Sequence, residues 1–190
     1  MTSTALRVPR SDTETVKRLG AQWDSTERHW FVPKGREVAA FAIWLPPEIP
    51  VDGPWIPVDV VLLPDYCYRC SGSTSPVLGL WLAHHLVDGY DHGMLEESGG
   101  WFLPYDETSA DVIAVACPDA LLVAHGAGPL RWRTTSRCPD GYLANTCQHC
   151  AAVIGNWPLH EALVEYRAEG GDVRDLPCVA SEFAGAALYI

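Results

Sequence analysis

Two pairs of cysteines with metal-ligand spacing are the residues in this chain best suited to chemistry. Cys67 and Cys70 form the first Cys-x-x-Cys pair, and Cys147 and Cys150 form the second. Two intervening residues let a tight turn direct both sulfurs at one point. Two such turns supply the four thiolates of a tetrahedral zinc site, with Zn–S distances of about 2.3 Å. The spacing therefore predicts one structural zinc ion held by all four cysteines.

Other interpretations of the cysteines are weaker. Redox Cys-x-x-Cys motifs occur singly before a helix in a βαβ unit, whereas this chain has two pairs. A disulfide framework is disfavoured because seven cysteines is an odd number and residues 1–10 lack the apolar stretch of a signal peptide. His149 lies inside the second pair and is the alternative fourth ligand. An all-cysteine shell leaves no open coordination position, which favours a structural metal over a catalytic one.

Composition indicates a folded protein. The 190 residues are 48% hydrophobic and include eight tryptophans, enough apolar side chains for a core. No apolar run reaches the roughly 18 residues of a membrane span. We expect a cytoplasmic protein, because a reducing compartment keeps thiols free for zinc, and we expect no membrane contact and no small-molecule cofactor.

The charge is distributed unevenly along the chain. The net charge is −11, yet residues 1–50 carry seven Lys/Arg and six Asp/Glu. Residues 51–190 carry six arginines, no lysine and eighteen acidic residues. Because an acidic body repels a phosphate backbone, any nucleic-acid contact is expected in the first fifty residues. The competing explanation is that the acidity only keeps the protein soluble.

The sequence pattern along the chain predicts an α+β protein with two domains. A small α/β module at residues 1–46 is joined by a proline-rich linker at 47–57 to an acidic zinc-ribbon-like domain with an antiparallel sheet at 58–190. In the module, the sequence predicts that Ser11 and Glu14 form a capping box and that Gly20 stops the helix. The expected order is strand, helix, strand, helix, at residues 6–9, 11–19, 30–32 and 36–45.

In the second domain, residues 71–146 form a large insertion between the two cysteine pairs. Strands are predicted at 58–63, 76–86, 130–134 and 142–146, with glycine-rich turns at 88–109 and a strand or helix at 111–116. A helix capped by Asn156 follows, with Leu159 and Leu163 on one face, and Gly170 ends it.

The first 46 residues resemble a known family. Val8-Pro9, Leu19-Gly20-Ala21, Trp23-Asp24, Trp30-Phe31-Val32-Pro33 and Phe41 to Trp44 follow its pattern of "VP … LGA-x-WD … W-x-VP … F-x-x-W". This is the small domain of unknown function found in plasmid TraC-type primases and other mobile-element proteins. Similar patterns occur in DNA-annealing helicase modules, so the resemblance implies a role in DNA metabolism. Gln22 stands where the family often has arginine.

The second domain resembles an unnamed bacterial family with two cysteine knuckles. Ser136, Gly141-Tyr142, Asn145, the second cysteine pair and Leu159-His160 carry this resemblance. Ala151 and Asn156 depart from the glycine and aspartate that are common there. The resemblance implies a zinc-stabilised fold and brings no known reaction.

Cations and tryptophans of the module form the candidate binding surface, since such a surface can hold phosphates and stack bases of a single strand. The candidates are Arg7, Arg10, Lys17, Arg18, Trp23, Arg28, Trp30 and Lys34. The alternative is that Trp23, Trp30 and Trp44 form the module's core, since small modules need large side chains there. Exposed tryptophans beside Arg/Lys would favour nucleic acid.

These features predict a non-catalytic, zinc-stabilised binding or adaptor protein. Its partner is an unknown protein, or single-stranded nucleic acid bound through residues 1–46. One alternative is a protein-interaction module whose acidic domain mimics nucleic acid or binds a basic partner. A second is a cysteine-dependent enzyme or redox protein, with Cys138 as nucleophile. The usual catalytic motifs are absent from the sequence, so we expect no enzymatic activity.

Overall fold

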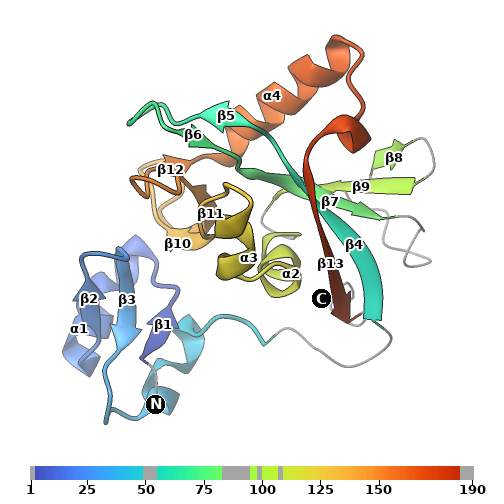
Figure 1. The fold of residues 1–190 in the computed structure, drawn as a ribbon. Helices are drawn as coiled ribbons and strands as arrows, with labels where there is room; N and C mark the ends of the chain where they lie inside the picture. Colours follow the sequence, from blue (N-terminus) through green and yellow to red (C-terminus); the bar gives the residue numbers. More distant parts are fainter. Residues whose placement is uncertain (1–2, 49–54, 83–94, 98–99, 107–108, 185–190) are drawn as a thin grey trace. The chain divides into compact units, whose positions relative to one another are not determined.

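The computed structural model describes residues 3–48, 55–82, 95–97, 100–106 and 109–184. The chain forms two compact units, Met1–Glu48 with Arg131–Leu143, and Ile49–Leu130 with Ala144–Ile190. Both contain helices and antiparallel strands, so the predicted α+β class is confirmed (Figure 1). The sequence predicted a single domain over residues 58–190, whereas Arg131–Leu143 belong to the N-terminal unit.

A three-stranded antiparallel sheet with the order β1-β3-β2 organises the N-terminal unit. Its strands are β1 (Thr4–Leu6), β2 (Gln22–Asp24) and β3 (His29–Val32). A short 3-10 helix, η1 (Arg10–Asp12), leads into α1 (Thr13–Leu19), and a second, η2 (Val38–Trp44), follows the sheet. Strand β10 (Arg131–Arg133) reaches this unit from far along the sequence and contacts β3.

Some local predictions for this unit are confirmed and others are wrong. Gly20 ends α1 with φ 97°, a left-handed conformation that glycine adopts easily. The capping box does not form, because the chain first makes η1 and the Ser11 hydroxyl donates to Asp12 Oδ1. The second helix is a 3-10 helix, whose three-residue turn directs both Phe41 and Trp44 inward. The first strand lies earlier than residues 6–9.

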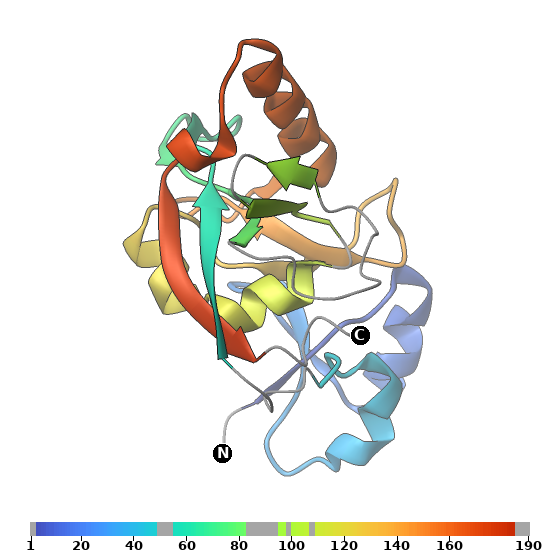
Figure 2. The same cartoon turned by 90° about the vertical axis from the view of Figure 1, so that its right-hand side faces the viewer.

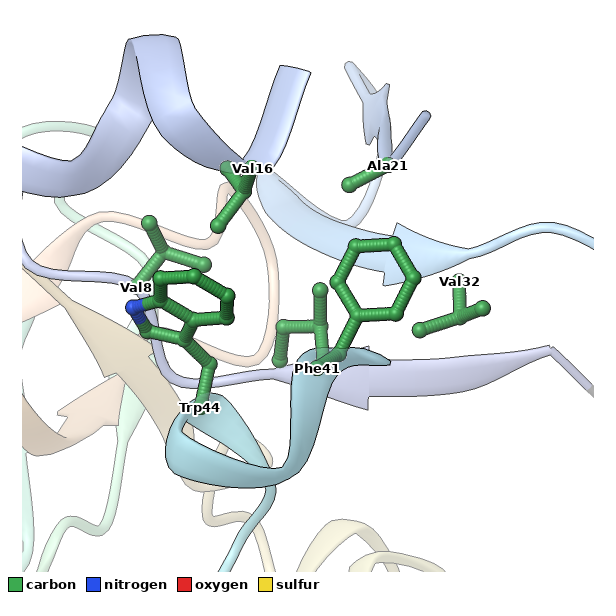
Figure 3. Packing of buried hydrophobic residues seen from close by; sticks show 7 residues of the cluster. Val8, Val16, Ala21, Val32, Phe41 and Trp44 are labelled. Carbon is green, nitrogen blue, oxygen red and sulfur yellow. The ribbon is translucent and has the colours of Figure 1, made fainter. Parts of the chain in front are cut away.

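The core of the N-terminal unit gathers side chains from both helices and the sheet (Figure 3). Phe41 and Trp44 lie side by side in it, with ring centroids 6.4 Å apart. Trp44 Nε1 donates to Asp12 Oδ2 at 2.9 Å, which satisfies its polar atom. Trp30 packs at the edge of this core, and Trp23 is 50% exposed. The three tryptophans therefore do not share one role, since Trp44 alone among them is fully in the core.

The second unit is built on a five-stranded antiparallel sheet with the order β13-β4-β7-β9-β8. Strands β4 and β13 pair along seven residues and run side by side (Figure 1, Figure 2). The strands are β4 (Trp55–Leu62), β7 (Val77–Leu82), β8 (Leu95–Glu97), β9 (Gly100–Pro104) and β13 (Cys178–Ala184).

Helices cover this sheet. Helix α4 (Asn156–Ala168) packs Leu159 and Leu163 against Val61 and Phe102, and α2 (Ser109–Ala116) contacts β7 and β13. Successive residues of β7 are buried, which requires cover on both faces. Helix α3 (Asp119–Ala124) and the 3-10 helix η3 (Val173–Asp175) complete the described elements outside the cysteine hairpins.

Several predicted boundaries in this unit differ from the structure. Strand β4 begins at Trp55, so the last three residues of the predicted 47–57 linker belong to the sheet. Strands β8 and β9 lie where turns were predicted, and the ambiguous segment at 111–116 is helical. Gly155, not Asn156, precedes the first turn of α4. Residues 49–54, and 83–86 of the predicted strand 76–86, lie outside the described part of the chain.

Candidate metal centre and nucleic-acid interface

Each cysteine pair lies in the loop of a short β-hairpin. Strands β5 (Asp65–Tyr66) and β6 (Ser73–Thr74) flank the first pair, and β11 (Tyr142–Thr146) and β12 (Val153–Ile154) flank the second. Both hairpins are antiparallel, pairing Tyr66 with Ser73 and Thr146 with Val153. The same local structure is therefore built twice, from segments about eighty residues apart.

The two loops share their backbone geometry. The Cys67 amide donates to Gly72 O, and the Cys147 amide donates to Ala152 O, each at 2.9 Å. The residue after each second cysteine is left-handed, with φ 56° at Ser71 and 53° at Ala151. Glycine adopts this conformation at lower cost than other residues, so both loops keep a strained residue where glycine would relax.

The four sulfurs converge on one point. Cys67 Sγ lies 3.6 Å from Cys150 Sγ, and Cys70 Sγ lies 3.7 Å from Cys147 Sγ. All four sulfurs lie within 4.8 Å of one another. A tetrahedron with bonds of about 2.3 Å separates its sulfurs by about 3.8 Å. The cluster could therefore bind one metal ion, and it is compatible with a zinc-ribbon-like part.

Main-chain amides stabilise the thiolate at one sulfur of the cluster, Cys67. All seven cysteines are free, so the disulfide framework is not formed. Main-chain amides of Cys70 and Arg69 lower the pKa of the Cys67 thiol to about 6, because N–H dipoles stabilise the thiolate. The His149 amide lies 3.4 Å from Cys147 Sγ in the same arrangement. At Cys150 the Ala152 amide also acts to lower the pKa, but burial and the neighbouring thiols outweigh it and raise the pKa.

His149 joins the two hairpins and lies outside the four-cysteine cluster. Its Nε2 lies 2.9 Å from the carbonyl oxygen of Ser73, on the other hairpin. The side-chain amide of Gln148, through Nε2, donates to the same oxygen at 3.0 Å. A Cβ on Gly72 would lie 2.6 Å from the His149 ring, so only glycine permits this approach. These contacts hold the two cysteine loops together from outside the sulfur cluster.

The other cysteines lie outside the cluster. Cys117 is buried, and burial raises its pKa to about 11, which keeps the thiol protonated. Burial also raises the pKa of the Cys178 thiol. These shifts are opposite to those of an activated nucleophile. Cys138 is half-buried in the N-terminal unit, where its amide donates to the Thr135 hydroxyl.

The division into units also separates the charges. The N-terminal unit carries ten Lys/Arg and seven Asp/Glu, a net charge of +3. The second unit carries three arginines and seventeen Asp/Glu, a net charge of −14. Arg131–Leu143 bring three arginines to the basic unit, so the tertiary structure sharpens an asymmetry that is already visible in the sequence.

A cavity of about 350 Å³ lies within this basic unit. It is lined by four of the eight predicted binding residues and by two that sequence reasoning missed. These six are Arg10, Trp23, Arg28, Trp30, Trp132 and Arg133. A cluster of arginines in the sequence could have indicated Trp132 and Arg133. Three of the six arginines in residues 51–190 lie close to Trp132, at positions 131, 133 and 137.

The other four predicted binding residues lie outside the lining of this cavity. The Arg7 guanidinium lies over the Trp132 ring, 5.2 Å from its centre. Lys17 pairs with Glu14 at 2.6 Å and lies 5.8 Å from the centre of the Trp30 ring. Arg18 donates to the Thr15 hydroxyl on its own helix, and Lys34 is exposed.

Comparisons with known proteins match the N-terminal segment. Residues 3–46 match a family described as Domain of unknown function (DUF5710). Two Escherichia coli proteins named DNA primase TraC are 51% and 41% identical over 39 residues. These matches cover 20% of this chain, and 4% and 3% of the primases. The N-terminal resemblance is thereby confirmed, whereas no family match shows the predicted double-knuckle family. No solved structure matches the chain.

Within the residues that the structure describes, none of the helices combines the length and apolar character needed to cross a membrane.

Proposed function

We propose that this protein is a non-catalytic, zinc-stabilised binding protein whose N-terminal unit contacts single-stranded nucleic acid. One observation carries the proposal: Trp23 is half exposed beside Trp30 in a unit of net charge +3. An exposed tryptophan next to cations is the arrangement that distinguishes a stacking surface from a core.

The aromatic pair has a geometry suited to stacking. The rings of Trp23 and Trp30 lie 5.4 Å apart and are inclined by 59°. Strands β2 and β3 pair these residues directly, and Lys17 lies near the Trp30 ring. Bases of a single strand stack on exposed indoles whatever their sequence, while nearby cations hold the phosphates. The surface therefore suits binding that is not sequence-specific.

Zinc is the metal that the four-cysteine cluster suits best. Thiolates are soft ligands, and four of them in a tetrahedral arrangement select zinc or an iron–sulfur cluster over harder cations. The shell leaves no position for a substrate, so the metal's role is to hold the two hairpins together. In this proposal Cys67, Cys70, Cys147 and Cys150 are all ligands.

The connection with DNA metabolism or mobile elements rests on the similarity to the primases. That similarity is confined to the N-terminal segment and covers a small fraction of each primase. We therefore extend to this chain a link with DNA metabolism and not primase activity.

A second candidate function follows from the acidic unit. With a net charge of −14, it would attract a basic protein or occupy a nucleic-acid site by mimicry. In the combined proposal, the basic unit binds the strand and the acidic unit recruits a protein in the cytoplasm.

Fluorescence anisotropy with a labelled single-stranded oligonucleotide tests the nucleic-acid proposal. Trp23→Ala should weaken binding by about 5- to 150-fold, because stacking of one base contributes about 1–3 kcal/mol. Trp157→Ala is the matched control, because Trp157 is 68% exposed but lies on α4 of the acidic unit. Affinity should also fall with salt, with a logarithmic slope of about −0.7 per phosphate contact. A salt-independent affinity, or equal losses in both variants, would contradict the proposal.

A further inference from the structure

Three arginines and three tryptophans make up six of the eleven described residues that line the cavity of the N-terminal unit, and none of the eleven is acidic. Its volume of about 350 Å³ is near the lower end of the roughly 300–1,000 Å³ range of small-ligand sites. The cavity therefore has the size for one small group rather than for a folded partner, and its arginines and indoles suit a group that is negatively charged and planar.

Arg133 is a buried cation at this cavity, and among the described residues its hydrogen bonds go to main-chain oxygens, although the Glu27 carboxylate attracts it at longer range. It is 7% exposed, and its guanidinium donates to the main-chain oxygens of Glu27, Arg28 and Trp132 at 3.0–3.1 Å. Its Nε has no hydrogen-bond partner. Carbonyl oxygens orient the guanidinium but do not neutralise it, so its positive charge stays available to an anion.

The backbone conformation of Arg28 is a second observation that supports a ligand site at this cavity. Its backbone is left-handed, with φ 57°, which is rare for a residue with a long side chain. Its carbonyl holds Arg133, while its own side chain is exposed and lines the cavity. Backbone strain of this kind persists where surrounding structure enforces it, and it concentrates at ligand sites.

Trp132 supplies an aromatic wall from a distant part of the sequence. Together with Trp23 and Trp30 it gives the cavity three indoles. The Arg7 guanidinium lies over its ring, a cation–π contact that holds the indole in place. An acidic peptide would need the cations alone, whereas a nucleotide uses both the cations and the indoles.

We propose that this cavity binds one nucleotide, with its base against the indoles and its phosphate beside Arg10, Arg28 and Arg133. The inference rests on the proposed single-strand binding and names the site within that unit. It also assigns a role to Arg131–Leu143: strand β10 completes the site, so the primase-like segment alone holds only part of it. The nucleotide comes either from a single strand or from solution.

Arg28→Gly in the full chain is the variant that best tests the cavity site. It removes one guanidinium from the cavity and keeps the carbonyl that holds Arg133. It also relaxes a left-handed residue, so the fold should be at least as stable as that of the wild type. We expect about tenfold weaker binding of a twelve-residue oligothymidylate, with an unchanged or higher melting temperature. Trp132→Phe keeps an aromatic wall and should lose less than Trp132→Ala.

Lys34→Ala is the matched control, because Lys34 is an exposed cation of the same unit outside the cavity lining. Its loss should weaken oligonucleotide binding less than twofold at moderate salt. Equal losses in Lys34→Ala and Arg28→Gly would overturn the cavity site and leave single-strand binding intact. Thymidine monophosphate is the second probe, and its binding is measured by the change in tryptophan fluorescence.

A nucleotide within a single strand and a free nucleotide are distinguished by which of the two probes binds. Binding of the oligonucleotide with Arg28→Gly sensitivity supports a site for a strand. Binding of the mononucleotide alone supports a site for a free nucleotide and overturns the proposed single-strand function. Binding of neither probe, or of a polyglutamate peptide in preference to both, overturns the inference.

Discussion

The side-chain amide of Asn145 pairs with the backbone of Val77 as a neighbouring strand would. Asn145 Oδ1 accepts from the Val77 amide at 2.7 Å, and Asn145 Nδ2 donates to the Val77 carbonyl at 3.0 Å. Asn145 lies two residues before Cys147 and is completely buried, while Val77 begins β7, the strand that follows the first hairpin. This pairing fixes the strand entering the second cysteine loop against the strand leaving the first.

Replacing this residue should therefore destabilise the second unit. Asn145→Ala leaves a buried donor and a buried acceptor of Val77 without partners, at a cost of about 2–4 kcal/mol of unfolding free energy. Urea unfolding monitored by circular dichroism measures it. Gln148→Ala is the control, because its hydrogen bond to Ser73 is exposed and water can replace it, so its cost should stay below about 1 kcal/mol. Similar costs for both variants would contradict this account.

Removing one cysteine of the cluster should remove the metal. We expect one zinc per chain in protein purified without added metal, and a large loss of zinc in Cys147→Ser, measured by elemental analysis. The second unit should then lose its cooperative thermal transition, because metal binding contributes about 10–16 kcal/mol in zinc-finger peptides. Cys138→Ser is the matched control and should keep its zinc, since Cys138 lies outside the cluster. An absence of zinc in the wild type would reopen redox chemistry for both pairs.

Relaxing the strained residue of the second knuckle should stabilise the protein. Ala151→Gly removes the cost of φ 53° at a residue with a Cβ, and the gain after the added backbone entropy is about 0.5–1 kcal/mol. Ala152→Gly, one residue further on, should instead destabilise by a similar amount, because Ala152 is buried without a left-handed backbone. Chemical denaturation of the zinc-bound protein compares the two, and a destabilising Ala151→Gly would show that the strain is relieved in another way.

His29 should make the stability of the N-terminal unit depend on pH. Desolvation lowers the pKa of His29 from its usual 6.5, so the folded unit binds this proton less tightly than the unfolded chain does. Stability is then fully present above pH 6.5 and decreases as the pH falls through the range below it. Unfolding at pH 7.5 and 5.5 should differ more in the wild type than in His29→Gln.

Protonation of Asp24 should also reduce the stability of the N-terminal unit, but at a lower pH than protonation of His29 does. The main-chain amides of Glu27 and Thr26 lower the pKa of the Asp24 carboxyl below its usual 3.8, so its contribution persists at pH 5.5. An equal pH dependence in wild type and His29→Gln would show that another group titrates in that range.

The four-cysteine cluster was predictable because its information is local. A Cys-x-x-Cys spacing determines how two sulfurs converge within one turn, and the repetition of that spacing identifies four candidate ligands without knowledge of the fold. The strand at Trp30 and the stop at Gly20 were predictable for the same reason. The capping box at Ser11 was not, because Trp44 takes one Asp12 oxygen and the chain prefers η1 there.

The sequence by itself determined the α+β class, the four cysteines, the charge asymmetry and the aromatic–basic character of the first 46 residues. Only the tertiary structure decided which tryptophan is core and which is exposed, since Trp44 packs beside Phe41 in the core whereas Trp23 lies on the edge strand β2. It also decided that Arg131–Leu143 join the N-terminal unit. Contacts between Arg133 and the carbonyls of Glu27 and Arg28 span more than a hundred residues, and no periodicity or spacing encodes a contact of that range.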